Sequence, residues 1–171
     1  MLRFTFTNKD IVDGLIQSDD NAIHYTTSTT SGINHKPLRS LSAGQTAGAI
    51  DWRTGVFDIG GVQRPTATLK HKNGGFFSSE REWMWSGKKY IVKPGGDQWT
   101  ATRRSDNKIC AIFTLRKSHI FKDSEPATIT FPVTIPAEDV LFLIMVMIYS
   151  VTREADKRSH SDSNMSNASS A

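Results

Sequence analysis

The sequence is very poor in cysteine: among its 171 residues there is one, Cys110. A single thiol excludes an internal disulfide framework and a zinc site built from cysteines. Cys110 lies in the apolar stretch Ile109–Phe113, where we expect a small buried side chain and not a nucleophile. With 37% hydrophobic and 22% charged residues, the composition is that of a single globular domain.

Patterns that carry catalysis or bind metals are also missing. The five histidines are scattered, and no GxSxG, HExxH or phosphate-loop pattern accompanies them. Glu80 and Glu82 share a strand face, and Asp51 and Asp58 can face each other across a hairpin. Glycosidase chemistry needs such a pair in a cleft, and no cleft is indicated. We therefore expect a protein that is not an enzyme and holds neither a metal ion nor a cofactor.

Long hydrophobic segments are few. Residues 1–7 alternate apolar and polar side chains, unlike the continuous apolar stretch of a secretory signal, so we expect a cytoplasmic protein. The longest apolar run is Val140–Val151. As a helix it covers about 18 Å, against about 30 Å of bilayer hydrocarbon. A transmembrane helix is therefore not expected, and any contact with a membrane should be peripheral.

Most of the chain predicts short strands separated by turns. Residues 2–7 alternate as a half-buried strand does, and residues 21–30 are rich in Thr, Tyr and Ile. Ser86-Gly87 is the clearest hairpin signal, and Thr54-Gly55 is a second. Further strands are expected near residues 99–103, 109–115 and 127–133. Turn signals about every ten residues indicate a meandering antiparallel sheet, closed or sandwiched.

From Pro136 onward, the sequence pattern changes from that of strands to that of a helix. Pro136 suits a first turn, and Glu138 and Asp139 complement the positive end of the helix dipole. The following residues up to Val151 are apolar all round, so this helix must be surrounded. We expect a domain over residues 1–158 whose core is a helix over about 136–158, and a disordered Ser-rich tail over 159–171. Trp83 and Trp85 share a strand face, which either packs on this helix, as we favour, or faces a ligand.

A barrel of short strands closed around one C-terminal apolar helix resembles the tubby-like group, which includes tubby C-terminal domains, LURP-one-related proteins and phospholipid scramblases. Within that group, the chain is most similar to an uncharacterised family of fungal, mainly basidiomycete, single-domain proteins. The matching segments are residues 49–52, 57–61, 76–83, 90–93 and 109–115, with the apolar helix after Pro136.

The resemblance implies a mainly β fold: a tubby-like closed antiparallel barrel of about 10–12 short strands around that helix. Tubby domains bind phosphoinositides through Lys and Arg on neighbouring strands, although no motif here aligns those residues one by one. Scramblases depend on clustered lipid-modified cysteines and acidic calcium ligands, which this chain lacks.

Positive charge is concentrated in the middle of the chain, where residues 66–125 hold 12 Lys and Arg against 6 Asp and Glu. Such an excess favours an anionic partner or is an ordinary solvated face. We expect a non-enzymatic module whose basic rim binds anionic phospholipid headgroups such as phosphoinositides. The rim residues are Lys88, Lys89, Arg103, Arg104, Arg116 and Lys117. The alternative is a protein-interaction or regulatory protein without lipid affinity. A nucleic-acid partner is not expected, because neither a recognition helix nor a clear stacking platform is present.

Overall fold

The computed structural model describes residues 1–28, 35–40, 46–74, 78–117 and 123–167. The two helices are α1 (Thr66–Leu69) and α2 (Ala137–Asn167). The strands are β1 (Leu2–Phe6), β2 (Gly14–Ser18), β3 (His24–Thr27), β4 (His35–Ser40), β5 (Thr46–Asp51), β6 (Val56–Ile59), β7 (Val62–Pro65), β8 (Lys70–Lys72), β9 (Arg81–Trp85), β10 (Lys88–Gly95), β11 (Gln98–Arg103), β12 (Ile109–Thr114) and β13 (Thr128–Phe131). The prediction of a mainly β chain with one long C-terminal helix is confirmed.

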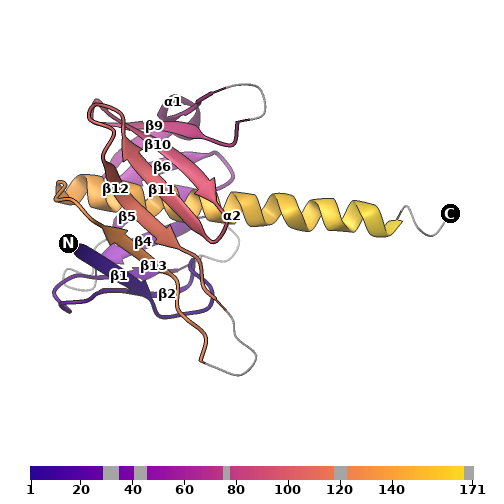
Figure 1. The fold of residues 1–171 in the computed structure, drawn as a ribbon, viewed down its shortest axis with the longest axis horizontal. Coiled ribbons are helices and arrows are strands. Elements are labelled where there is room, and N and C mark those ends of the chain that lie inside the picture. Colours follow the sequence, from indigo (N-terminus) through magenta and orange to yellow (C-terminus); the bar gives the residue numbers. More distant parts are fainter. Residues whose placement is uncertain (29–34, 41–45, 75–77, 118–122, 168–171) are drawn as a thin grey trace.

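All thirteen strands belong to one antiparallel sheet, in the order β7-β6-β5-β4-β3-β2-β1-β13-β12-β11-β10-β9-β8. Strands that pair in the sheet are consecutive in sequence, except for the pair β1 and β13. This pairing places the first strand of the chain beside its last strand. Within the described ranges no pairing joins the two end strands, β7 and β8, which are connected through α1. The strands therefore form an open sheet with β7 and β8 at its edges, and this sheet curls around α2 (Figure 1).

The predicted hairpins are present. Ser86 and Gly87 both have positive φ, 47° and 76°, and they join β9 to β10 with Trp85 opposite Lys88. This is a two-residue turn whose twist matches that of the strands it joins. The second residue of the turn needs a positive φ, which glycine adopts without strain. The turn at Thr54-Gly55 joins β5 to β6 as expected. Strands β2, β4, β7 and β8 were not predicted; β7 is exposed along its whole length and has no apolar alternation to reveal it.

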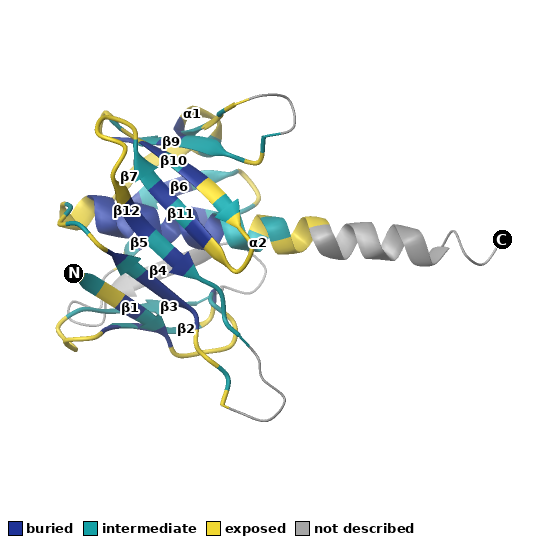
Figure 2. Cartoon of the chain, viewed as in Figure 1, coloured by how far each residue is buried: buried dark blue, intermediate teal, exposed yellow. Residues whose placement is uncertain are grey.

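The first half of α2 is the core of the fold. Every residue from Val140 to Tyr149 is buried, and those from Phe142 to Met147 are completely inaccessible (Figure 2). Trp83 and Trp85 point inward and pack on it: Trp85 stacks on Phe142 with ring centroids 5.4 Å apart. An all-apolar helix is stable here because its side chains from Val140 to Tyr149 are removed from water. The predicted helical core and the inward tryptophan face are both confirmed.

The second half of α2 runs beyond the sheet (Figure 1). The helix begins at Ala137, as expected, but ends at Asn167 and not near Arg158, so residues 159–167 of the predicted disordered tail are helical. No glycine or proline follows Pro136, so the sequence contains no strong stop signal, and serine lowers helix propensity only moderately. The rest of the predicted tail, residues 168–171, lies outside the described residues. No helix in the described part of the chain is long and apolar enough to cross a membrane.

Candidate functional site

The six cations predicted to form one rim lie at two ends of the sheet. Arg103 pairs with Tyr90 across β10 and β11, and the backbone N–H of Arg104 donates to the carbonyl of Lys89. Lys88, Lys89, Arg103 and Arg104 therefore lie at the end where α2 begins, which we call the Asp139 end. Arg116 and Lys117 follow the last residue of β12 at the opposite end, where α2 leaves the sheet beside Val151. We call this the Val151 end.

Lys88 at the Asp139 end points toward the start of α2. Its ammonium group lies 2.5 Å from a carboxylate oxygen of Asp139, whose side chain is only 1% exposed. Next to this pair the indole N–H of Trp85 donates to Glu138. Burial, together with the charge of Asp139, raises the pKa of the Tyr90 phenol. These contacts tie the first turn of α2 to the β9–β10 hairpin, so Lys88 has a structural role.

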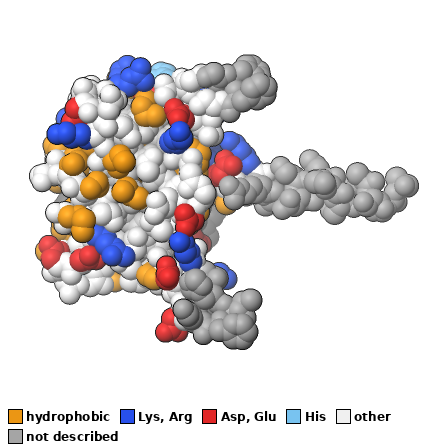
Figure 3. All heavy atoms as spheres, viewed as in Figure 1, with side chains coloured by type: hydrophobic (Ala, Val, Ile, Leu, Met, Phe, Trp, Pro, Cys, Tyr) orange, Lys and Arg blue, Asp and Glu red, His pale blue; other side chains and the backbone are white. Residues whose placement is uncertain are grey.

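The other three predicted cations of the Asp139 end are also matched by acids. Lys89 and Arg104 both approach Glu82, at 3.1 and 3.7 Å. Arg103 donates two hydrogen bonds to the carboxylate of Asp106, at 2.9 and 2.7 Å. These hydrogen bonds lower the pKa of Asp106 to about 2. These acids therefore compensate much of the positive charge of the four cations. On the face drawn in Figure 3, Lys and Arg side chains lie next to Asp and Glu side chains in several places.

The carboxylate pairs considered for catalysis also have structural partners. Glu80 forms an ion pair with Lys93 at 3.1 Å, in the same way that Glu82 holds Lys89. Asp58 accepts a hydrogen bond from the backbone N–H of Gly61 in the turn after β6. These carboxylates stabilise the sheet surface and a turn.

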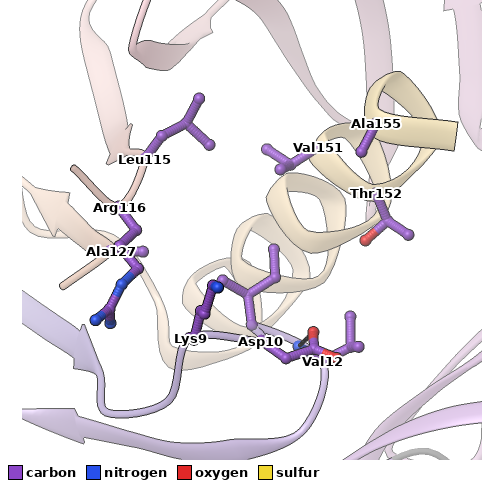
Figure 4. A pocket seen from close by; sticks show the side chains of 10 residues that line it. Lys9, Asp10, Val12, Leu115, Arg116, Ala127, Val151, Thr152 and Ala155 are labelled. Carbon is purple, nitrogen blue, oxygen red and sulfur yellow. Dashed lines mark hydrogen bonds between the residues drawn. The ribbon is translucent and has the colours of Figure 1, made fainter. Parts of the chain in front are cut away.

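At the Val151 end, α2 emerges between loops and leaves an apolar groove on both sides. One part has a volume of about 450 Å³ and the other about 480 Å³, and both are lined by Leu115, Val151 and Ala155. Figure 4 shows Leu115 and Val151 pointing toward each other across the first part. The remaining apolar lining comes from the β1–β2 loop, the β10–β11 hairpin, β11 and the start of β13: Ile11, Val12, Pro94, Trp99 and Ala127. We call this feature the exit groove.

Two cations, Lys9 and Arg116, and two acids, Asp10 and Glu154, border the exit groove. Within the described ranges, neither cation forms an ion pair within 4.0 Å. The Nε of Arg116 is buried and has no hydrogen-bond partner there. A buried donor without a partner costs about 1–3 kcal/mol, which an anion at this position would offset. The neighbouring Lys117, by contrast, is paired with Asp97 at 2.6 Å.

Sequence reasoning included Arg116 but missed Lys9 and the groove. Lys9 is followed by Asp10 in a short polar segment that predicts a turn. This local pattern does not indicate that Lys9 lies near Arg116, more than a hundred residues further along the chain. The two meet because β1 lies next to β13, whose start lies beside the end of β12.

Other chemistry has little support in these side chains. The described part of the chain has no group of three or more His, Cys, Asp or Glu side chains that could hold a metal ion. Cys110 is fully buried, and burial raises the pKa of its thiol, which makes it a poor nucleophile.

Comparisons of the chain with protein-family models, with curated proteins and with solved structures found no match. The tubby-like resemblance therefore remains a prediction from the sequence.

Proposed function

We propose that this chain is a non-enzymatic module that binds anionic phospholipids at the exit groove, with the phosphate at Lys9 and Arg116 and an acyl chain along Leu115 and Val151. The observation that carries the proposal is the Arg116 side chain, a cation at the edge of an apolar groove that has no acidic partner among the described residues. An anionic amphiphile matches both features, because its charge would pair the guanidinium and its chain would cover the apolar wall.

The expected energies are consistent with measurable binding. Each methylene group removed from water contributes about 0.8 kcal/mol, and each Lys or Arg close to an anionic lipid surface about 1 kcal/mol. Lys9, Arg116 and a few methylene groups buried in the groove are then enough for measurable binding. The cations of the Asp139 end are less suited to this role, because a phosphate there must displace Glu82 or Asp106.

The proposal extends to the finer form of the fold and to location. The sheet starts and ends with β7 and β8, which are adjacent in sequence, so contact between them would close it into the barrel that the tubby-like resemblance implies. Phosphoinositide binding by tubby domains agrees with an anionic lipid as ligand. We further propose that the protein is cytoplasmic and meets membranes peripherally.

Co-sedimentation with vesicles tests this function. The purified protein is mixed with phosphatidylcholine vesicles, with and without phosphatidylserine, at low and at high salt. We expect binding to the anionic vesicles alone, weakened by salt. Neutralising both groove cations, as K9Q/R116Q, should lower the affinity about tenfold or more, since two contacts of about 1 kcal/mol are lost.

The matched control removes the same charge at the other end. K89Q/R104Q should change the affinity less than about twofold, because these cations are already paired with Glu82. Val151→Thr, which places a hydroxyl in the apolar groove, should weaken binding. Its melting temperature is measured in parallel, because Val151 also packs against the core. If the protein binds neither kind of vesicle, the lipid function is wrong, and the protein-interaction alternative takes its place.

A further inference from the structure

Two further cations, Lys70 and Arg153, lie beside Tyr149 and have no carboxylate partner in the part of the chain that the structure describes. They lie on a different face of α2 from the exit groove. Tyr149 and Arg153 are four residues apart and share one side of the helix, whereas Val151 and Ala155 share another. The Tyr149 ring is 4% exposed and stacks on Trp52, with centroids 5.0 Å apart and planes 10° apart. Packing on several elements therefore fixes the position of the phenol.

Two cations lie over this aromatic group. The ammonium group of Lys70 is 5.1 Å from the centroid of the Tyr149 ring and 5.7 Å from that of Trp83. The guanidinium of Arg153 is 5.7 Å from Tyr149 and 5.9 Å from Trp52. Neither cation forms an ion pair within 4.0 Å with any residue that the structure describes. Ring faces attract cations but do not neutralise them, so two positive charges lie beside one phenol with no described carboxylate paired to either.

The titration of Tyr149 reflects this arrangement. Burial alone would raise the pKa of the phenol, but hydrogen bonding to Arg153 and the charges of Lys70 and Arg153 outweigh it, and the pKa is lowered. The chain has two other tyrosines, Tyr25 and Tyr90, and burial raises the pKa of both. We therefore expect Tyr149 to be the first of the three phenols to ionise as the pH rises.

We propose that Lys70, Arg153 and the Tyr149 hydroxyl form a binding site for a phosphate monoester. A monoester carries a charge between about −1.5 and −2 at neutral pH and has three acceptor oxygens, which matches two cations and a hydroxyl donor. Arginine binds such a group through two parallel N–H donors, and lysine supplies a compact point charge. The monoester can belong to a lipid headgroup or to a free phosphorylated molecule. This site is separate from the exit groove and does not rest on the function proposed for it.

Phenol absorbance detects occupancy of this site. The absorbance of phenolate is followed against pH in sodium chloride and in sodium phosphate of the same ionic strength. Bound phosphate screens the two cations, so we expect the lowest tyrosine pKa to move up toward its ordinary value. Tyr149→Phe should abolish this first titration step, which confirms its assignment. An unchanged titration in phosphate overturns the proposal.

Variants then assign the donors. Lys70→Gln and Arg153→Gln should each weaken phosphate binding about tenfold or more, and Arg153→Lys should restore part of it. Each variant is checked for an unchanged unfolding midpoint, since Arg153 is exposed and Lys70 half-buried. Phosphate affinity equal to that of the wild type in both glutamine variants would contradict the assignment.

Vesicles separate the two sources of the monoester and separate this site from the groove. Vesicles with a phosphatidylinositol monophosphate, which carries a monoester, are compared with phosphatidylserine vesicles of equal charge, which carry only a diester. A shift of the Tyr149 pKa with inorganic phosphate supports a site open to free ligands, and a shift with monoester vesicles alone supports a lipid headgroup. An equal shift with phosphatidylserine contradicts the proposal. K9Q/R116Q should leave the phosphate response intact even where it abolishes binding to phosphatidylserine.

Discussion

The two ends of the sheet differ in how their positive charges are compensated. At the Asp139 end, Lys88 pairs with Asp139 of the helix, and Lys89 shares Glu82 with Arg104. At the Val151 end, Lys9 and Arg116 have no such partner within the described residues, and they border an apolar groove. The segment with the largest excess of Lys and Arg thus has its charge compensated at one end, whereas cations at the other end remain available.

A physical reason for the difference lies in α2. Its first turn contains Glu138 and Asp139, which favour the positive end of the helix dipole and supply acids to the strands beside them. At the Val151 end the helix leaves the sheet between mainly apolar side chains. Lys117 pairs there with Asp97, but no carboxylate pairs with Lys9 or Arg116 within the described residues. A cation without a partner indicates a ligand site better than the net charge of a segment does.

The largest effect is expected for Ile144→Asp, in the part of α2 that lies between the two ends. This residue is completely buried, and an unpaired charge there should cost more than about 4 kcal/mol and prevent folding. Ala155→Asp, on the exposed part of the same helix, should fold like the wild type. Circular dichroism and size-exclusion chromatography compare the two. A cooperative, wild-type-like Ile144→Asp protein would show that α2 is not the core.

A smaller effect is expected from breaking the buried pair at the Asp139 end. Lys88→Met leaves the Asp139 carboxylate buried without its partner and should cost about 2–4 kcal/mol, measured by urea unfolding. The same replacement at the Val151 end, Arg116→Met, removes a buried donor that has no partner among the described residues, so it should not lower stability and should raise it by up to about 1–3 kcal/mol. Equal losses for the two variants would show that the ends do not differ as described.

The smallest effect concerns the exposed Arg103–Asp106 pair. Arginine lowers the pKa of Asp106 to about 2, from an ordinary value near 3.8. The stabilisation is therefore complete above pH 3.8 and is lost as the pH falls through about 2. Asp106→Asn should lower the unfolding midpoint slightly at neutral pH and leave it unchanged at the acid end of that range. A loss of stability by Asp106→Asn that increases as the pH falls would contradict this prediction.

The sequence predicted those parts of the fold that depend on local patterns. Twelve successive residues with one polar interruption predict a surrounded helix, and Ser86-Gly87 between two alternating segments predicts a hairpin, because each signal lies within a few residues. The inward face of Trp83 and Trp85 follows from the alternation of a strand. The polar composition of residues 159–167 predicts disorder, but these residues continue α2 to Asn167. The helix continues because the sequence has no glycine or proline there to end it.

The candidate site depends on long-range contacts, which a single sequence does not reveal. Lys88 pairs with an acid 51 residues further along, and that pairing turns a predicted ligand residue into a structural one. The exit groove combines the β1–β2 loop with the end of β12 and with α2, and this follows only from the position of β1 beside β13. Of the six predicted rim residues, Arg116 alone borders the groove.

We propose that a lipid binds at the Val151 end and not at the end richest in predicted rim residues. Photo-crosslinking with a phosphatidylserine that carries a photoreactive acyl chain tests this placement, with the labelled peptides identified by mass spectrometry. We expect labelling of Ile11, Leu115 and Val151 or their immediate neighbours, and its loss in K9Q/R116Q. Labelling confined to residues 88–104, and unaffected by K9Q/R116Q, would contradict it.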